Sequence, residues 1–117
     1  MDRLDAMLEN VRSFVREREW ESFHDPKNLA MAIASEAGEL CAELRWVSNA
    51  EADAFLTDAD ARRRVVDELA DVAICMFMLA DRVGVDVPEI VADKLARIRD
   101  RYPVELTRGR ADVPPKR

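Results

Sequence analysis

The strongest structural signal in this sequence is DELADVAICMFML, residues 67–79. Every residue from 72 to 79 is apolar. A helix that is apolar all round is buried, so this run predicts a helix in the centre of a bundle or at an interface between subunits. Two acids, Glu68 and Asp71, stand directly before the run, at positions where the helical pattern otherwise calls for apolar residues.

Apolar spacing and helix-capping residues predict three further helices around this one. Asp25 and Pro26 form a helix start, because aspartate caps the first turn and proline fits the first helical position. Gly84 suits the left-handed residue after a helix end, Asp86 starts the next helix, and Pro103 ends it. The predicted helices span about residues 4–19, 26–46, 58 or 60 to 83, and 87–101. The expected fold is therefore all-α, a four-helix bundle-like unit.

The remaining segments predict a connector and a tail. Residues 48–60 are small and acidic and break the helical pattern, which indicates a connector that holds a short helix around residues 50–56. Residues 108–117 contain two adjacent prolines and several basic residues, so we expect a disordered basic tail. The prediction is a single helical domain over residues 1–107, followed by this tail.

The composition fits one compact acidic domain. The chain has 117 residues, of which 49% are hydrophobic and 36% charged, and only 3 are glycine, a composition typical of helical proteins. The 24 acidic residues outnumber the 18 basic ones and give a formal net charge of -6, which disfavours binding to a nucleic acid polymer. A small anionic substrate would be repelled as well, unless the acids gather where a metal ion reverses the local charge.

Several classes of protein are excluded by what the sequence lacks. No apolar run reaches the length of a membrane span, and the N-terminal residues lack a signal-peptide apolar region, so we expect a cytoplasmic protein without a membrane partner. Cys41 and Cys75 lie in apolar helical stretches rather than in a CxxC motif and are expected to be buried free thiols. Because His24 is the single histidine, histidine-based zinc and di-iron signatures are excluded.

Two pairs of acids define the candidate functional site. Glu36 and Glu39 form one pair, and Glu68 and Asp71 form the other. In each pair the spacing of three places both carboxylates on one helical face, with Cβ atoms about 5 to 6 Å apart. If the two helices pack antiparallel, four carboxylates converge, which protonation, several arginines or divalent cations would make tolerable. Such oxygen ligands favour Mg²⁺ or Mn²⁺. The other interpretation is that each pair lies on a solvated helix face.

Motifs along most of the chain resemble one family of enzymes. The matching stretches are residues 18–29, 36–40, 67–72 and 85–103, together with Trp46. In this order the chain is similar to the MazG-like all-α nucleoside triphosphate pyrophosphohydrolases, and most similar to their short dCTP pyrophosphatase branch. The resemblance covers about residues 4–103 and is more specific than either acidic pair. It implies Mg²⁺-dependent hydrolysis of a (deoxy)nucleoside triphosphate to the monophosphate and pyrophosphate.

The resemblance also implies roles for the acids. Carried over residue by residue, the metal ligands are Glu36, Glu39, Glu68 and Asp71. One carboxylate would orient or deprotonate the attacking water. Many relatives have a second glutamate where this chain has Ser35, which leaves Glu39 or a hydroxide on the metal as the candidate base. We take Glu39 as the expected catalytic residue.

For the nucleoside end, the resemblance points to Trp20, Ser22, His24 and Trp46, which match positions that contact the nucleotide in the short branch. Tryptophan faces stack on bases, and such stacking contributes about 1 to 3 kcal/mol per base in single-strand binders. The other interpretation of the two tryptophans is core packing. Lys94 is expected to supply positive charge to the phosphates.

Three departures from the family pattern concern the nucleoside end. A tyrosine four residues after the last metal-binding acid is Cys75 here, a histidine of the first helix is Val11, and an asparagine of the last helix is Ile98. These departures do not affect the four predicted metal ligands.

The expected substrate is dCTP or a modified pyrimidine nucleotide. The alternative is a non-catalytic helical module for oligomerisation or nucleotide binding. Because a small unit with the apolar run 72–79 buries limited surface alone, we expect a homodimer or homotetramer.

Overall fold

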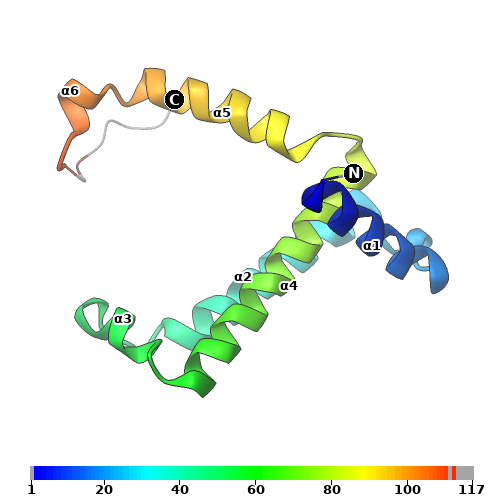
Figure 1. Cartoon of the computed structure of the whole chain (residues 1–117), viewed down its shortest axis with the longest axis horizontal. Helices are drawn as coiled ribbons and strands as arrows, with labels where there is room; N and C mark the ends of the chain where they lie inside the picture. The colour runs from blue at the N-terminus through cyan, green and yellow to red at the C-terminus, as the bar shows by residue number, and fades with distance from the viewer. Residues whose placement is uncertain (1, 111, 113–117) are drawn as a thin grey trace. The chain divides into compact units, whose positions relative to one another are not determined.

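The structure is a computed structural model that describes residues 2–110 and 112. Over this range its regular elements are all helical, which confirms the predicted all-α class (Figure 1). The elements are α1 (Arg3–Glu17), η1 (Glu21–Phe23), α2 (Pro26–Leu44), η2 (Asn49–Glu51), α3 (Ala52–Phe55), α4 (Ala59–Val83), α5 (Val87–Arg101) and α6 (Val104–Thr107). The chain divides into two compact units, Met1–Gly84 and Val85–Arg117. In the described part of the chain, no helix has the length and apolar character to cross a membrane.

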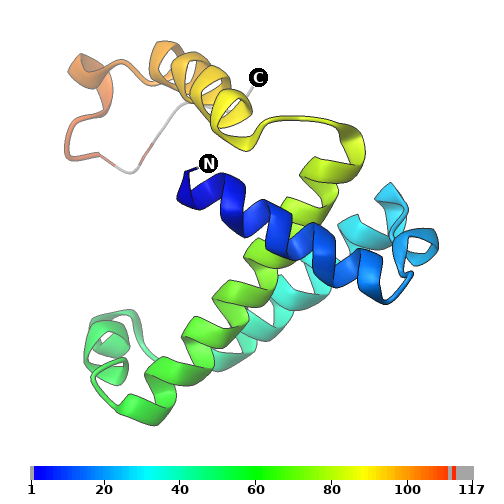
Figure 2. The ribbon, with the colours of Figure 1, turned by 45° about the vertical axis from the view of Figure 1, so that its right-hand side comes forward.

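In the first unit, α2 and α4 lie side by side and run antiparallel (Figure 2). α1 packs across α4 near the end of α4, where Arg12 Nε donates a hydrogen bond to Asp81 Oδ1 at 2.7 Å. At the other end of the α2–α4 pair, α3 and η2 pack on each other and form the connection. The middle of α2 therefore faces the middle of α4, and both of these regions carry the predicted acids.

Aspartates explain where four of the helices begin. Each accepts a hydrogen bond from the backbone N–H three residues further on, at 2.8 to 3.1 Å; these residues are Asp2, Asp25, Asp58 and Asp86. A cap of this kind contributes about 1 kcal/mol. Gly84 ends α4 with a φ of 73°, a conformation that glycine adopts without a Cβ penalty. The predicted starts at Asp25 and Asp86 and the predicted end at Gly84 are confirmed, and α4 begins after the first of its two predicted starts.

Two helices are shorter than predicted. α1 ends at Glu17 rather than at residue 19, and Glu19 has a left-handed φ of 53°, so the chain leaves the helical path there. α2 ends at Leu44 rather than at Trp46. Neither end has a glycine to specify it, and apolar spacing does not define the last turn of a helix. The short helix predicted around residues 50–56 is confirmed by η2 and α3.

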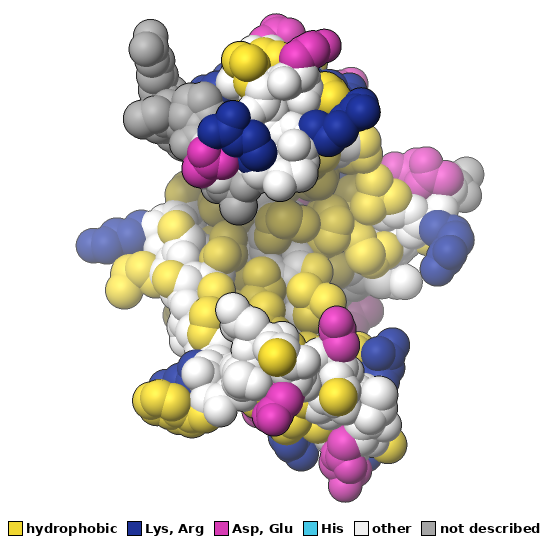
Figure 3. All heavy atoms as spheres, turned by 90° about the vertical axis from the view of Figure 1, so that its left-hand side faces the viewer, with side chains coloured by type: hydrophobic (Ala, Val, Ile, Leu, Met, Phe, Trp, Pro, Cys, Tyr) yellow, Lys and Arg dark blue, Asp and Glu magenta, His cyan; other side chains and the backbone are white. Residues whose placement is uncertain are grey.

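The core of the first unit is small. The buried hydrophobic residues among those described are Val15, Leu29, Ala61 and Ala80. The run 72–79 is partly exposed in the single chain, where Ile74 is 41% exposed and Met76 39% exposed, so its predicted burial at an interface between subunits stays a prediction. Within this unit α4 packs on α2 and, near its end, on α1, and part of its apolar surface stays exposed. Figure 3 shows hydrophobic side chains at the surface among the charged ones.

Both cysteines are free thiols, but only one of them is partly buried. Cys75 is half-buried on α4, and burial is the largest cause that raises the pKa of its thiol. Cys41 is exposed on α2, so the predicted burial is wrong for this residue. The reason is that α2 packs on α4 along one side, and Cys41 lies outside the covered side.

The second unit contains α5, with the predicted bounds, and α6. The sequence pattern does not predict α6, because Pro103 was interpreted as a helix end. Proline also fits the start of a new helix, since the first N–H groups of a helix need no intrahelical partner. Of the predicted tail, residues 108–110 and 112 are described, and Arg110 pairs with Asp112; the rest lies outside the described residues. The division into a domain over residues 1–107 and a disordered tail stays a prediction.

Candidate functional site

Helices α2 and α4 bring three acidic side chains together, which we call the carboxylate cluster. Glu36 and Glu39 lie one turn apart on α2, and Glu68 lies on α4. One carboxylate oxygen of each residue lies within 4.8 Å of the corresponding oxygens of the other two. A spacing of three places both α2 acids on one face. Antiparallel packing then sets that face against Glu68.

Two oxygens of the carboxylate cluster lack a hydrogen-bond partner among the described residues. They are Glu36 Oε2 and Glu68 Oε2, and both atoms are buried. Buried polar atoms are normally paired, because an unpaired atom loses its hydration without compensation. Buried carboxylate oxygens without a partner are the atoms to which a cation or a ligand donor would bind.

Burial and like charges raise the pKa of both half-buried acids. Burial is the largest cause at Glu68, followed by the neighbouring carboxylates of Glu39, Asp71 and Glu36, and together they raise the pKa of Glu68 to about 7. The pKa of Glu36 is raised by burial first and then by Glu39. The cluster therefore retains a proton part of the time at neutral pH. A divalent cation relieves the same repulsion, so cation binding and protonation compete.

Asp71, the fourth predicted ligand, is exposed and lies outside the group of three clustered oxygens. Its charge still raises the pKa of Glu36, Glu68 and Cys75, so its carboxylate lies near the cluster. Asp71 follows Glu68 by one helical turn, which explains this proximity. The structure thus brings three of the four predicted metal ligands together and leaves the fourth at their edge.

A neighbouring acid on α2 is compensated by an arginine. Arg64 Nε on α4 donates to Glu43 Oε2 at 3.1 Å. Arg64 precedes Glu68 by one turn, yet its guanidinium bridges to Glu43 instead of adding a positive charge between the clustered acids. Glu43, which is half-buried, is therefore one member of an ion pair between the two helices.

A cavity of about 590 Å³ is lined by residues of η1, α2 and α4. Its residues are mostly apolar; they are Phe23, His24, Asn28, Leu29, Met31, Ala32, Ser35, Cys75 and Met78. Two of its residues are neighbours of the cluster: Ser35 directly precedes Glu36, and Cys75 lies near enough to Glu36 for that carboxylate to raise the pKa of its thiol. Sequence interpretation missed Asn28, Met31 and Ala32 as cavity residues. Their signal was their spacing, because positions 28, 31, 32 and 35 share one face of a helix.

The predicted nucleoside contacts reach this cavity only in part. His24 lines the cavity, and the ring of Trp20 meets that of His24 edge-on, with centroids 6.4 Å apart. Ser22 lies in η1 and is exposed, and Trp46 is 85% exposed and does not line the cavity. Core packing is therefore excluded for Trp46, and Trp20 is 41% exposed. Lys94 lies on α5 in the second unit, and its role stays a prediction.

Two antiparallel helices that carry a carboxylate cluster beside a cavity define an all-α protein with a candidate site for a cation and an organic ligand. The chain belongs to the MazG-like family, whose sequence model matches residues 31–111. The matched part contains all four predicted metal ligands and most residues that line the cavity. The resemblance seen in the sequence is thereby confirmed.

Several pyrophosphatases are similar to this chain in sequence or structure over most of its length. It is 42% identical over 111 residues to dCTP pyrophosphatase 1 of Rattus norvegicus, which covers 92% of this chain and 65% of the relative. The protein of that name from Homo sapiens is 38% identical over 109 residues, with 90% and 64% covered. A solved pyrophosphatase from Archaeoglobus fulgidus has a TM-score of 0.82 and 31% identity, with 88% and 94% covered. The chain thus spans about 65% of the length of the curated relatives it matches.

Proposed function

We propose that this chain is a nucleotide pyrophosphohydrolase that cleaves a (deoxy)nucleoside triphosphate, dCTP or a modified pyrimidine nucleotide, to the monophosphate and pyrophosphate. The observation that carries the proposal is the carboxylate cluster, with its two buried unpaired oxygens. The relatives named dCTP pyrophosphatase 1 and pyrophosphatase support it. The cytoplasmic location expected from the sequence stays a prediction.

The carboxylate cluster fits a divalent cation, and we propose Mg²⁺, with Mn²⁺ as the alternative. All donors are carboxylate oxygens, which these hard cations prefer. Glu36, Glu39 and Glu68 would hold the ion, with Asp71 as the fourth ligand. When bound, such a cation neutralises triphosphate oxygens and lowers the pKa of a coordinated water.

Glu39 is the proposed catalytic base. It is the exposed member of the carboxylate cluster, whereas Glu36 and Glu68 are half-buried, so Glu39 is the one that solvent reaches most easily. Its carboxylate would take a proton from the water whose oxygen forms a bond to the α-phosphorus. The bond from this phosphorus to the bridging oxygen breaks at the same time, and the electron pair leaves with pyrophosphate.

The cavity beside the carboxylate cluster is proposed to hold the nucleoside. Its apolar wall suits a base and a sugar, with His24, Asn28 and Ser35 as polar groups in its lining. Trp20 contacts His24 and so lies on the same side of the site. Trp46 and Lys94, which do not line this cavity, remain proposed contacts from the family resemblance.

We propose further that the chain assembles as a homodimer or homotetramer. Large hydrophobic side chains are exposed on both long helices of the C-terminal half; they include Val66, Leu69, Ile74 and Met76 on α4, and Ile90, Val91 and Leu95 on α5. Exposed apolar side chains on each of the two units favour coverage by a second copy. Light scattering at micromolar concentration is expected to give a multiple of the chain mass, and a monomeric mass would contradict the proposal.

The activity is tested by pyrophosphate release from a panel of deoxynucleoside triphosphates with Mg²⁺, with identification of the nucleotide product. We expect a monophosphate and pyrophosphate, and loss of release in Glu39→Gln and Asp71→Asn. Absence of release from every triphosphate, or activity that survives both substitutions, would contradict the proposal. Nucleotide binding in calorimetry without hydrolysis in Mg²⁺ or Mn²⁺ would favour the non-catalytic alternative.

A further inference from the structure

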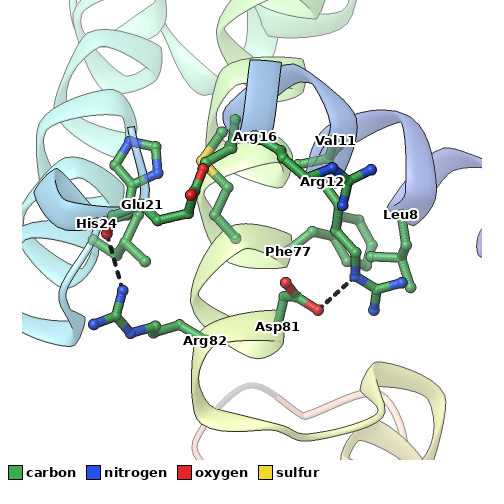
Figure 4. Close-up of a pocket in the computed structure, with 12 residues that line it drawn as sticks. Leu8, Val11, Arg12, Arg16, Glu21, His24, Phe77, Asp81 and Arg82 are labelled. Carbon is green, nitrogen blue, oxygen red and sulfur yellow. Dashed lines mark hydrogen bonds and ion pairs between the residues drawn. The ribbon is translucent and has the colours of Figure 1, made fainter. Parts of the chain in front are cut away.

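The connection between α1 and α2, residues 18–25, borders two cavities. One is the 590 Å³ cavity described above, and the other, of about 270 Å³, lies between α1, η1 and α4 (Figure 4). His24, Leu29 and Met78 line both cavities. Close packing is what normally holds a segment in place. A connection that borders two cavities gains less from packing, so its position depends on hydrogen bonds.

Two side chains hold this connection by its backbone carbonyls. Arg82 of α4 donates from Nη1 to the carbonyl oxygen of Glu21 at 3.0 Å (Figure 4). Asn28 of α2 donates from Nδ2 to the carbonyl oxygen of Phe23 at 3.1 Å. The two carbonyls lie two residues apart and are bound from two different helices. Together the bonds fix the middle of the connection against both helices that carry the site.

The backbone at the start of the connection shows why it needs this support. Glu19 has a φ of 53°, in a region that residues other than glycine seldom adopt. The Trp20 N–H returns to the carbonyl oxygen of Val15 at 3.2 Å, so the chain reverses directly after α1. Such a conformation persists only where the surrounding structure holds it. The residues beyond this reversal include Trp20, Ser22 and His24, the proposed nucleoside contacts.

We propose that Arg82 is a positioning residue for the nucleoside end of the substrate, with Asn28 in the same role from the other side. The inference rests on the proposed function. Arg82 acts through the Glu21 carbonyl, and so sets the positions of His24 and Trp20, without contact to the reacting phosphates. Nucleoside contacts are made in the ground state and the transition state alike. Loss of their positioning therefore raises KM and leaves kcat nearly unchanged.

The kinetic test compares Arg82→Met and Asn28→Asp with a matched control, Arg12→Met. Arg12 lines the same 270 Å³ cavity and ties α1 to α4 through Asp81, but its hydrogen bond does not involve the connection. For dCTP with Mg²⁺, we expect KM to rise about 5- to 10-fold in Arg82→Met and Asn28→Asp, with kcat within about twofold. Arg82→Lys retains a cationic donor and is expected to recover most of the increase. The control is expected to keep the KM of the unchanged chain.

A second measurement needs no turnover. With Trp46→Phe in all variants, Trp20 is the single tryptophan, and its quenching by acrylamide reports the order of the connection. We expect quenching to increase in Arg82→Met and not in Arg12→Met. If the unchanged chain hydrolyses no nucleotide, the proposed function fails, and quenching still tests Arg82.

Circular dichroism checks that each variant folds. If Arg82→Met does not fold, Asn28→Asp provides the same comparison with the control. The proposal is overturned if Arg82→Met, or Asn28→Asp in its place, equals Arg12→Met in quenching or, in the active enzyme, in KM. It is also overturned if kcat falls while KM is unchanged.

Discussion

Asp81 and Glu68 are both acids of α4, but they have opposite neighbours. At the end of the helix that α1 crosses, Asp81 accepts a hydrogen bond from Arg12 at 2.7 Å, and this bond raises the pKa of the Arg12 guanidinium. Nearer the start of the helix, Glu68 faces Glu36 and Glu39, and its pKa rises to about 7. One acid is compensated within the chain, and the other is placed among like charges.

The difference between these two regions indicates where an external ligand is needed. The chain has 18 basic residues, and Arg64 lies one turn from Glu68, so basic residues were available to compensate the cluster. Arg64 instead pairs with Glu43. A carboxylate cluster that the fold leaves uncompensated destabilises the free protein, and strongly perturbed groups beside a cavity are typical of functional sites. The comparison can be tested by changing each acid in turn.

The largest effect is expected on activity. Glu68→Gln removes a proposed ligand while keeping the size of the side chain, and pyrophosphate release with Mg²⁺ is expected to fall at least about 100-fold, the scale on which lost metal contacts and acid–base groups act. Asp81→Asn changes an acid of the same helix outside the cluster and is expected to stay within a few fold of the unchanged chain. Equal losses of kcat/KM in the two variants would contradict the proposal that the carboxylate cluster, and not the Asp81 end of α4, is the active site.

The next effect is on stability in the presence of the cation. A ligand at a hundred times its Kd stabilises the folded state by about 2.7 kcal/mol, so saturating Mg²⁺ should raise Tm by several degrees in a thermal melt. Glu36→Gln is expected to lose most of this increase, because it removes one of the unpaired oxygens. Arg12→Met should retain the full increase. A Tm that does not respond to Mg²⁺ or Mn²⁺ would contradict the proposed metal site.

Much of the fold was predictable because its signals are local. Asp25, Asp86 and Gly84 each act within one helical turn, so the sequence placed these helix boundaries correctly. The carboxylate cluster was predictable for a similar reason: a spacing of three determines a shared face, and the antiparallel packing on which the prediction depended is present between α2 and α4 (Figure 2). The prediction was less complete for Asp71, because its distance from the other acids depends on the exact rotation of α4.

The rest depends on contacts between distant parts of the chain. Nothing near Arg82 in the sequence indicates that it binds the Glu21 carbonyl, since the two residues meet only when α4 and η1 pack. The two cavities likewise arise from packing. The sequence did not decide between the two predicted environments of Ile74 and Met76, because an apolar run indicates that a surface will be covered, but not whether the same chain covers it.

The pH dependence of stability distinguishes the two regions further. The pKa of Glu68 is about 7 in the folded chain, against an ordinary value of 4.5, so the folded state binds this proton more tightly than the unfolded state. Its contribution to stability is fully present below about pH 4.5 and is lost as the pH rises through 7. With EDTA present, the urea midpoint of the unchanged chain should fall from pH 5 to pH 8 more than that of Glu68→Gln. Parallel curves for the two proteins would contradict the raised pKa.

The smallest effect is expected where the charges are already compensated. The Arg12 and Asp81 side chains are 43% and 41% exposed, and exposed ion pairs contribute little because water and salt screen them. We expect each of three variants, Arg12→Met, Asp81→Asn and the double variant, to lower Tm by at most about 4 °C. The coupling between the effects of the two single substitutions should vanish near about 1 M salt. Thermal melts at low and high salt measure this. Coupling between the two substitutions that persists in high salt would mean that the Arg12–Asp81 ion pair helps to hold α1 on the end of α4. The two regions of α4 would then differ in the sign of the charges around the acid, but not in how much those charges matter for stability.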